Sequence, residues 1–178
     1  MEQQRKAAHS GWYHETQSSQ YGHLPLDPHA ALVQDRFLLG LDTRLDPTLR
    51  QLLNERQRLL QAARVCYEVL FPDNLEVSRS ETLSLYDRLS GALTVAQVSG
   101  VQALCSHYAA RLAPLPSPDA SRESNLRQTH ITQFARLLAT QPTLITPPTL
   151  NQLYDVGFTT RDIVTFTPMI GFVSSQPC

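Results

Sequence analysis

Apolar residues recur along this chain at intervals of three and four positions, which is the spacing of one face of an α-helix. The clearest run begins at Asp46-Pro47, where an aspartate cap and a proline at the first helical position are typical of a helix start. It continues to Phe71, and Pro72 then ends it. The apolar positions in the run are Leu49, Leu52, Leu53, Leu60, Ala63, Tyr67 and Leu70. We therefore expect one long amphipathic helix over residues 47–71.

A pair of helices is predicted over residues 83–112, with the sequence LSLYDRLSGALTVAQVSGVQALCSHYAARL. Ser80 can cap the first helix, and Glu81 would then lie in its first turn, where a carboxylate complements the helix dipole. Gly100 interrupts the pattern, because glycine inside a helix costs about 1 kcal/mol relative to alanine. The second helix would run from Val101 to the proline-rich loop that begins at Pro114.

Four further helices are predicted from cap residues and apolar spacing. Their caps are Asp27 before Pro28, Ser121 or Ser124, Thr146 before two prolines, and Thr159 or Thr160. The first of them would reach about Leu39, and the third would end at Gly157 in a left-handed cap. The inward positions of the second and fourth are Ile131, Phe134, Leu137, Leu138, Ile163, Phe166, Ile170 and Val173. Pro168 lies inside the last helix and should kink it or split it.

No stretch shows the alternation of a β-strand, so the sequence predicts an all-α fold of six to eight helices. Residues 27–178 would form one domain, which is long enough to bury a core. Residues 1–26 are polar and without period, and we expect an arm there. Its aromatic residues suggest packing across a subunit boundary, whereas its histidines leave a metal or ligand site open. These residues are His9, Trp12, Tyr13, His14, Tyr21 and His23.

Charge, apolar runs and cysteine spacing argue against several classes of function. A net charge of −1 without a basic stripe argues against nucleic acid binding. No apolar run approaches the roughly 20 residues that span a bilayer, and the N-terminus lacks the apolar core of a signal peptide, so we expect a cytoplasmic protein. Cys66, Cys105 and Cys178 are far apart and form no Cys-x-x-Cys pair or zinc pattern. We expect free thiols in a reducing compartment, without metal or cofactor.

The order of the predicted elements resembles the alkylhydroperoxidase D-like superfamily, which includes the carboxymuconolactone decarboxylases. The resemblance covers roughly residues 27–176 and is nearest to the peroxidase-related branch. It is carried by a helix ending VCYEVLFPD, by the helix pair of residues 83–112, and by the later segment TPPTLNQLYDVGFTTRDIVTFTPMIGFVSSQ. It implies an all-α fold, an oxidoreductase activity, a small peroxide or organic acid as substrate, and assembly into a homotrimer or homohexamer.

Active members of that superfamily carry a glutamate, a Cys-x-x-Cys pair, and a histidine four residues after the second cysteine. The first thiol lies at a helix N-terminus, which favours the thiolate, and the histidine and glutamate relay its proton. When the pattern is placed on His107, the thiol positions become Gly100 and Ala103, and the glutamate position becomes Arg88. Only the histidine remains, so the dithiol mechanism cannot run at these positions. The decarboxylase branch also lacks the cysteine pair, and the fold is therefore not excluded.

The candidate site residues are His107, Arg88, Tyr86 and Cys105. Cys105 lies about 200° around the helix from His107, so the two cannot form a dyad within that helix. Cys105 is therefore either a buried structural cysteine or a thiol activated by another element. His107 is either hydrogen-bonded inside a helix interface or an altered proton-transfer site.

Arg88 could approach His107 and lower its pKa, and in a decarboxylase-like reaction it would hold a substrate carboxylate. Tyr86 and Asp87 could supply an acid or a hydrogen bond, although Asp87 and Arg88 also fit a solvated surface pair. His130 and Arg136 are expected on the surface.

The resemblance, together with these residues, implies two alternative functions. The first is an enzyme of the alkylhydroperoxidase D-like type, either peroxidase-related or a thiol-independent decarboxylase-like enzyme acting on a small acid. The second is a non-catalytic helical subunit, or partner-binding protein, that retains the scaffold without its thiols.

Overall fold

The structure, a computed structural model, describes residues 29, 30, 36 and 46–176. The whole predicted arm, most of the predicted first helix, and Cys178 lie outside these residues. The described part contains seven α-helices and one short 3-10 helix, η3 (Pro142–Leu144), so the all-α prediction of six to eight helices is confirmed. The helices are α1 (Pro47–Glu55), α2 (Gln57–Leu70), α3 (Leu85–Ser99), α4 (Gln102–Leu112), α5 (Arg122–Thr140), α6 (Pro147–Asp155) and α7 (Thr160–Ser174).

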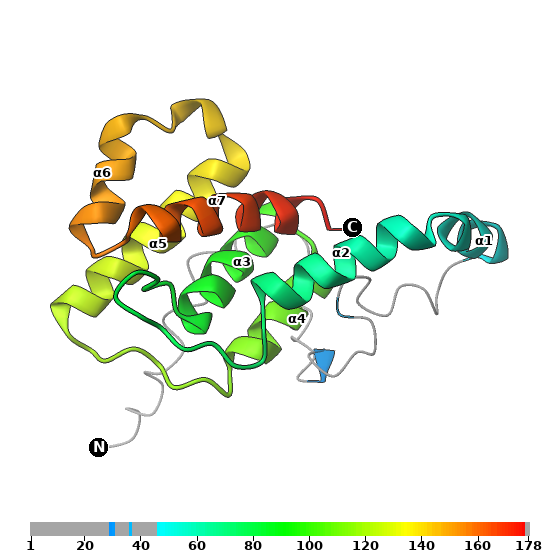
Figure 1. The fold of residues 1–178 in the computed structure, drawn as a ribbon, viewed down its shortest axis with the longest axis horizontal. Helices are drawn as coiled ribbons and strands as arrows, with labels where there is room; N and C mark the ends of the chain where they lie inside the picture. The colour runs from blue at the N-terminus through cyan, green and yellow to red at the C-terminus, as the bar shows by residue number, and fades with distance from the viewer. Residues whose placement is uncertain (1–28, 31–35, 37–45, 177–178) are drawn as a thin grey trace, which may run out of the picture.

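Helix α3 is the centre of the fold and packs against α4, α5 and α7 (Figure 1). Every residue from Asp87 to Ala96 is buried, which means that neighbours cover this helix on all sides. Four of these buried residues are polar or charged: Asp87, Arg88, Ser90 and Thr94. Because a buried polar group needs a partner, the packing of α3 depends on long-range hydrogen bonds as well as on apolar contact.

Several helix boundaries agree with the sequence. Asp46 caps α1 through its side chain, Ser121 caps α5, and Thr159 caps α7. Gly100 and Gly157 adopt φ values of 71° and 88°, which only glycine adopts at little cost, and each follows the end of a helix. These boundaries were predictable because each depends on residues close together in the sequence.

Three predictions about boundaries were wrong. The helix over residues 47–71 is interrupted at Arg56, without a proline or glycine to mark the break, and α1 has no buried residue whose packing would hold it in line with α2. Ser84, not Ser80, caps α3, because Ser84 and Asp87 form a reciprocal capping box. Glu81 therefore lies before the helix rather than in its first turn.

Helix α7 continues through Pro168, where the sequence predicted a kink or a split, and it is not split. Proline removes one backbone hydrogen bond from the helix interior. The buried side chains of Phe166, Met169, Ile170 and Val173 surround this position in the sequence and pack into the core. Tertiary packing thus holds the helix together across the missing bond.

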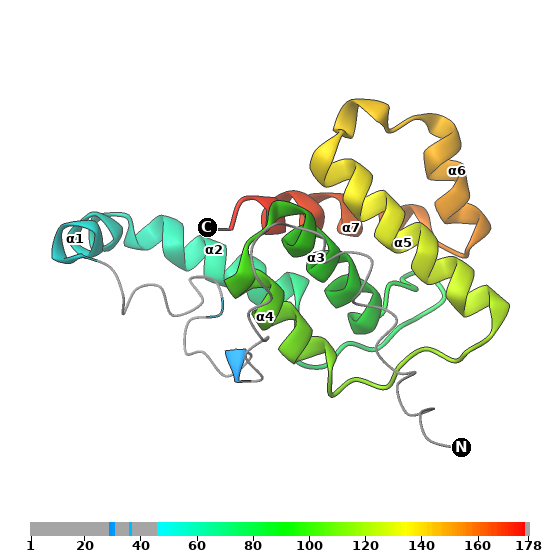
Figure 2. The same ribbon diagram turned by 180° about the vertical axis from the view of Figure 1, so that it is seen from behind.

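Helices α1 and α2 extend to one side of the molecule, with α1 at the far end, in both views (Figures 1 and 2). Only the C-terminal part of α2, from Tyr67 onward, contributes fully buried residues to the core. The remainder carries large exposed apolar side chains.

The close contact between α3 and α7 generates a test of the fold. A Cβ atom at Gly91 would lie 2.6 Å from Cζ of Phe166. Phe166 cannot easily move, because its ring stacks on Phe134 and meets Phe158 edge-on. We expect Gly91→Ala to lower the free energy of unfolding by about 1–3 kcal/mol, measured by urea denaturation.

The matched control is Gly171→Ala in the interior of α7, where nothing lies within 4 Å of the added methyl group. Removing a helix-interior glycine there should raise stability by up to about 1 kcal/mol. Equal effects at the two glycines would contradict the close packing of α3 against α7.

Candidate functional site

His107 is completely buried on α4, and both of its ring nitrogens are within hydrogen-bond distance of a partner. Nδ1 lies 3.0 Å from the carbonyl oxygen of Ala30, and Nε2 lies 2.6 Å from the hydroxyl of Tyr67. A carbonyl only accepts, so Nδ1 carries the proton, and Nε2 accepts from the Tyr67 hydroxyl. The imidazole is therefore neutral, with one donated and one accepted hydrogen bond.

Arg111, on the same helix, completes this arrangement. One of its guanidinium nitrogens donates to the Tyr67 hydroxyl oxygen over 2.7 Å. Burial lowers the pKa of His107 to about 4, and the nearby cations Arg111 and Arg36 act in the same direction against the opposing bond to Ala30. The sequence predicted a lowered pKa but assigned it to Arg88. The direction agrees, whereas the causes are burial and different arginines.

Arg88 points to the end of α2 and not to His107. Its guanidinium donates to the Leu70 carbonyl over 2.9 Å and to the carboxylate of Glu81 over 2.8 Å. Asp87 and Arg88 are 4% and 3% exposed, so the interpretation of a solvated surface pair was wrong. The pKa of Arg88 is lowered by burial, and Glu81 opposes this. Arg88 is held by structural partners in the position where the resemblance placed a carboxylate-binding group.

Arg111 binds the same helix end. Its second guanidinium nitrogen donates to the Phe71 carbonyl over 3.0 Å and lies 3.3 Å from the carboxylate of Asp73. Helix C-termini leave carbonyl groups without helical partners and carry partial negative charge. Arg88 and Arg111 together supply donors and positive charge to the C-terminus of α2.

Cys105 is buried on α4, which agrees with the predicted alternative of a buried structural cysteine. Burial raises the pKa of its thiol to about 11, so the group remains protonated near neutral pH. The positions at which the resemblance places the two thiols hold Gly100, in the left-handed cap of α3, and Ala103, in the first turn of α4. Cys66 is a free thiol on the exposed side of α2.

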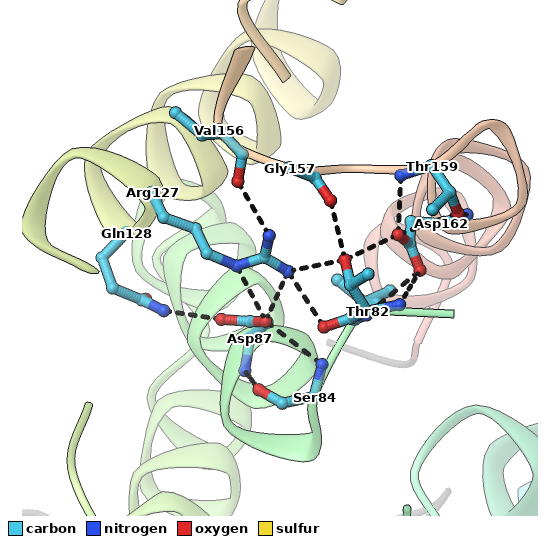
Figure 3. A network of polar contacts seen from close by, with 10 residues as sticks. Thr82, Ser84, Asp87, Arg127, Gln128, Val156, Gly157, Thr159 and Asp162 are labelled. Atoms are coloured by element: carbon cyan, nitrogen blue, oxygen red, sulfur yellow. Dashed lines mark hydrogen bonds and ion pairs between the residues drawn. The ribbon is translucent and has the colours of Figure 1, made fainter. Parts of the chain in front are cut away.

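A polar network that sequence reasoning missed joins the segment before α3 to the start of α7 (Figure 3). The completely buried carboxylate of Asp162 accepts hydrogen bonds from the backbone N–H groups of Thr82, Leu83 and Thr159. The hydroxyls of Thr82 and Thr159 also donate to it. Burial alone would raise the pKa of Asp162, but these hydrogen bonds outweigh it and lower the pKa.

The same network continues to Asp87 on α3 (Figure 3). Gln128 donates to Oδ1 of Asp87 over 2.6 Å, and Arg127 donates to Oδ2 over 3.0 Å. Arg127 also reaches the carbonyl oxygens of Val156 and Thr82. A sequence signal for part of this network exists, since Ser84/Asp87 and Thr159/Asp162 both have capping-box spacing. Their partners on α5 have no such signal.

Tyr86 is separated from the other candidates and lines a cavity of about 420 Å³. The cavity lies where the first turn of α3, the loop after α4 and the start of α5 meet. Its remaining lining residues are Val77, Thr82, Ser84, Leu85, Asp87, Leu115, Pro116, Pro118, Ser124, Arg127 and Gln128. A second cavity of about 160 Å³ between α5 and α6 is lined partly by His130, which is half-buried, whereas Arg136 is exposed as expected.

The four candidates therefore do not form one site. Tyr86 lines the larger cavity, while His107, Cys105 and Arg88 line neither of the two cavities. Within residues 29, 30, 36 and 46–176, no group of three or more His, Cys, Asp and Glu side chains is placed to hold a metal ion. No helix in the described part is long and apolar enough to cross a membrane.

Comparison with protein-family models, with curated proteins and with solved structures found no match to this sequence.

The buried neutral His107 generates a prediction about pH. Its pKa is lower in the folded state than in the unfolded state, so the unfolded chain binds an extra proton between about pH 6.5 and pH 4. The stability from the neutral imidazole is complete above pH 6.5 and is lost as the pH falls through this window. The full effect is on the order of 3 kcal/mol. We expect His107→Gln to flatten the fall in unfolding free energy over this range, measured by urea denaturation at several pH values.

The half-buried His130 on α5 provides the control. His130→Gln should retain the wild-type dependence on pH. An identical dependence in wild type and His107→Gln would exclude a buried neutral imidazole at position 107.

Proposed function

We propose that this protein is a non-catalytic helical subunit of alkylhydroperoxidase D-like architecture that assembles with further copies of itself. One observation carries the proposal: His107 is completely buried, and each ring nitrogen is already engaged by Ala30 or Tyr67. A general base needs a basic nitrogen within reach of the proton that it removes. A histidine with a pKa of about 4 and no contact with a described cavity does not meet that requirement.

The chemistry of the thiols supports the same proposal. A dithiol peroxidase needs a thiolate of low pKa and a resolving thiol one helical turn away. Gly100 and Ala103 occupy those positions, and Cys105 on the same helix has a thiol pKa of about 11. A decarboxylase-like enzyme would instead need Arg88 for a substrate carboxylate, but that guanidinium is bound to Leu70 and Glu81.

The exposed surfaces of helices α1 and α2 support self-association. Helix α1 is nine residues long and has no buried residue, and isolated helices of this length are unstable in water. On α2, three large apolar side chains lie within about 120° of the helix circumference. These are Leu59, Val65 and Val69, which are 64%, 47% and 68% exposed and which we call the α2 stripe. A second copy brings an identical stripe, so a symmetric contact would cover both at once.

The first test measures peroxide consumption with dithiothreitol as the reductant, using hydrogen peroxide and a small organic peroxide. We expect no consumption above the buffer rate, because burial raises the pKa of the Cys105 thiol to about 11 and Gly100 and Ala103 carry no thiol. Cys105→Ser should leave this result unchanged. A rate above background that disappears in Cys105→Ser would overturn the non-catalytic proposal and reassign Cys105 as a reactive thiol.

The second test concerns assembly. Multi-angle light scattering should give the wild-type protein a mass that is a multiple of 20.0 kDa, and the resemblance favours three or six copies. The double variant Leu59→Glu, Val69→Glu should dissociate, because buried unpaired carboxylates oppose the contact.

Val164→Glu on α7 is the matched control, because Val164 is 65% exposed and lies outside the stripe. It should assemble like the wild type. A wild-type protein that is monomeric at every concentration would refute the assembly.

A further inference from the structure

The larger cavity is a built site with three walls from distant parts of the sequence. The segment before α3 contributes Val77, the first turn of α3 contributes Leu85, and the loop after α4 contributes Leu115, Pro116 and Pro118. These five residues are apolar, and the hydroxyl-bearing residues Thr82, Ser84, Tyr86 and Ser124 also line the cavity. The volume of about 420 Å³ lies within the range of cavities that bind small organic molecules.

The floor of the cavity contains a carboxylate and a guanidinium that neutralise each other. Oδ2 of Asp87 accepts from the Ser84 backbone and from Nε and one terminal nitrogen of Arg127, while Oδ1 accepts from Gln128. That terminal nitrogen of Arg127 also donates to the Thr82 carbonyl. Both charges are committed within the protein. A charged ligand would lose its hydration and meet no available counter-charge, which disfavours ions of either sign.

One polar atom of the floor remains without a partner. Gln128 lines the cavity and is 5% exposed, and its Nε2 donates to Asp87. Its Oε1 is buried, and no described group donates a hydrogen bond to it. The floor therefore lacks a donor rather than an acceptor. A hydroxyl group supplies a donor without a charge, and a small movement of the carboxamide would bring Oε1 to it.

We propose that this cavity binds a small, neutral, largely apolar molecule that carries one hydroxyl group. The apolar body lies against the proline loop and Leu85, and the hydroxyl donates to Gln128 on the floor. This binding role goes beyond the proposed assembly, since the cavity and the α2 stripe have no residue in common.

Four probes of similar size separate the contributions of the apolar ring, the hydroxyl group and a charge of either sign to binding. They are benzyl alcohol, toluene, benzoate and benzylamine. Binding is measured by chemical-shift titration of the full chain labelled with ¹⁵N, which also reports the Gln128 side-chain amide. Benzyl alcohol should bind about fivefold more tightly than toluene, the gain from one hydrogen bond to a buried acceptor. Benzoate and benzylamine should bind at least about tenfold more weakly than benzyl alcohol.

Two variants locate the binding. Val77→Trp places a large ring at a position that is 56% exposed, and it should abolish the binding of both neutral probes by filling the cavity. Val164→Trp, at an exposed valine outside the cavity, should bind like the wild type. Gln128→Leu should bind toluene as before and lose the advantage of the alcohol.

The proposal is overturned if either ion binds as tightly as the alcohol, or if toluene equals the alcohol in the wild type. Unchanged binding in Val77→Trp would also overturn it, because the site would then lie elsewhere. The wild-type ranking of the four probes keeps the test decisive should Gln128→Leu fail to fold. A monomeric protein that binds benzyl alcohol as expected would refute the assembly alone and leave this site intact.

Discussion

The interaction on which the rest of the structure depends is the binding of the C-terminus of α2 by two buried arginines. Arg88 from α3 and Arg111 from α4 donate to the carbonyl oxygens of Leu70 and Phe71, where the helix has no further N–H groups of its own. This attachment fixes the last turns of α2 against the core. It also places Tyr67 between Arg111 and His107, so that Tyr67 accepts from one and donates to the other. Removing either arginine would leave buried carbonyl groups without a donor, which is more costly than the loss of an exposed ion pair.

Asp87 and Arg88 show how one helix serves two networks. They are neighbours in the sequence, but side chains one residue apart diverge by about 100° on a helix. Arg88 therefore points to the end of α2, while Asp87 points to Arg127 and Gln128 on α5. Each charge is satisfied by a different part of the chain. The two networks hold different sides of α3, and this explains how a central helix can bury consecutive charged residues.

The local features of the fold could be predicted from the sequence, whereas the partners of the buried polar groups could not. Thr159 and Gly157 mark helix ends because caps and left-handed turns depend on adjacent residues. The burial of Cys105 followed from its apolar helical face. By contrast, Arg88 was expected beside His107 because the chain would fold back at Gly100. Its actual partner, the carbonyl of Leu70, is a backbone group that no residue pattern identifies. The prediction of one site containing His107, Arg88, Tyr86 and Cys105 was wrong for the same reason, because the directions of their side chains depend on how the helices pack.

The location of the cavity follows from the same division of polar groups. His107 and Arg111 on α4 and Arg88 near the start of α3 are bound by protein partners, although Nε of Arg88 is buried without a hydrogen-bond partner among the described residues. Where the first turn of α3 meets the loop after α4, the cavity walls include Pro116 and Pro118, which have no backbone N–H groups and therefore leave an apolar surface. There the floor is neutral, and one acceptor on Gln128 lacks a donor. Because Arg88 and Asp87 point to different partners, the polar contacts of α3 with the end of α2 stay apart from the cavity that Asp87 lines.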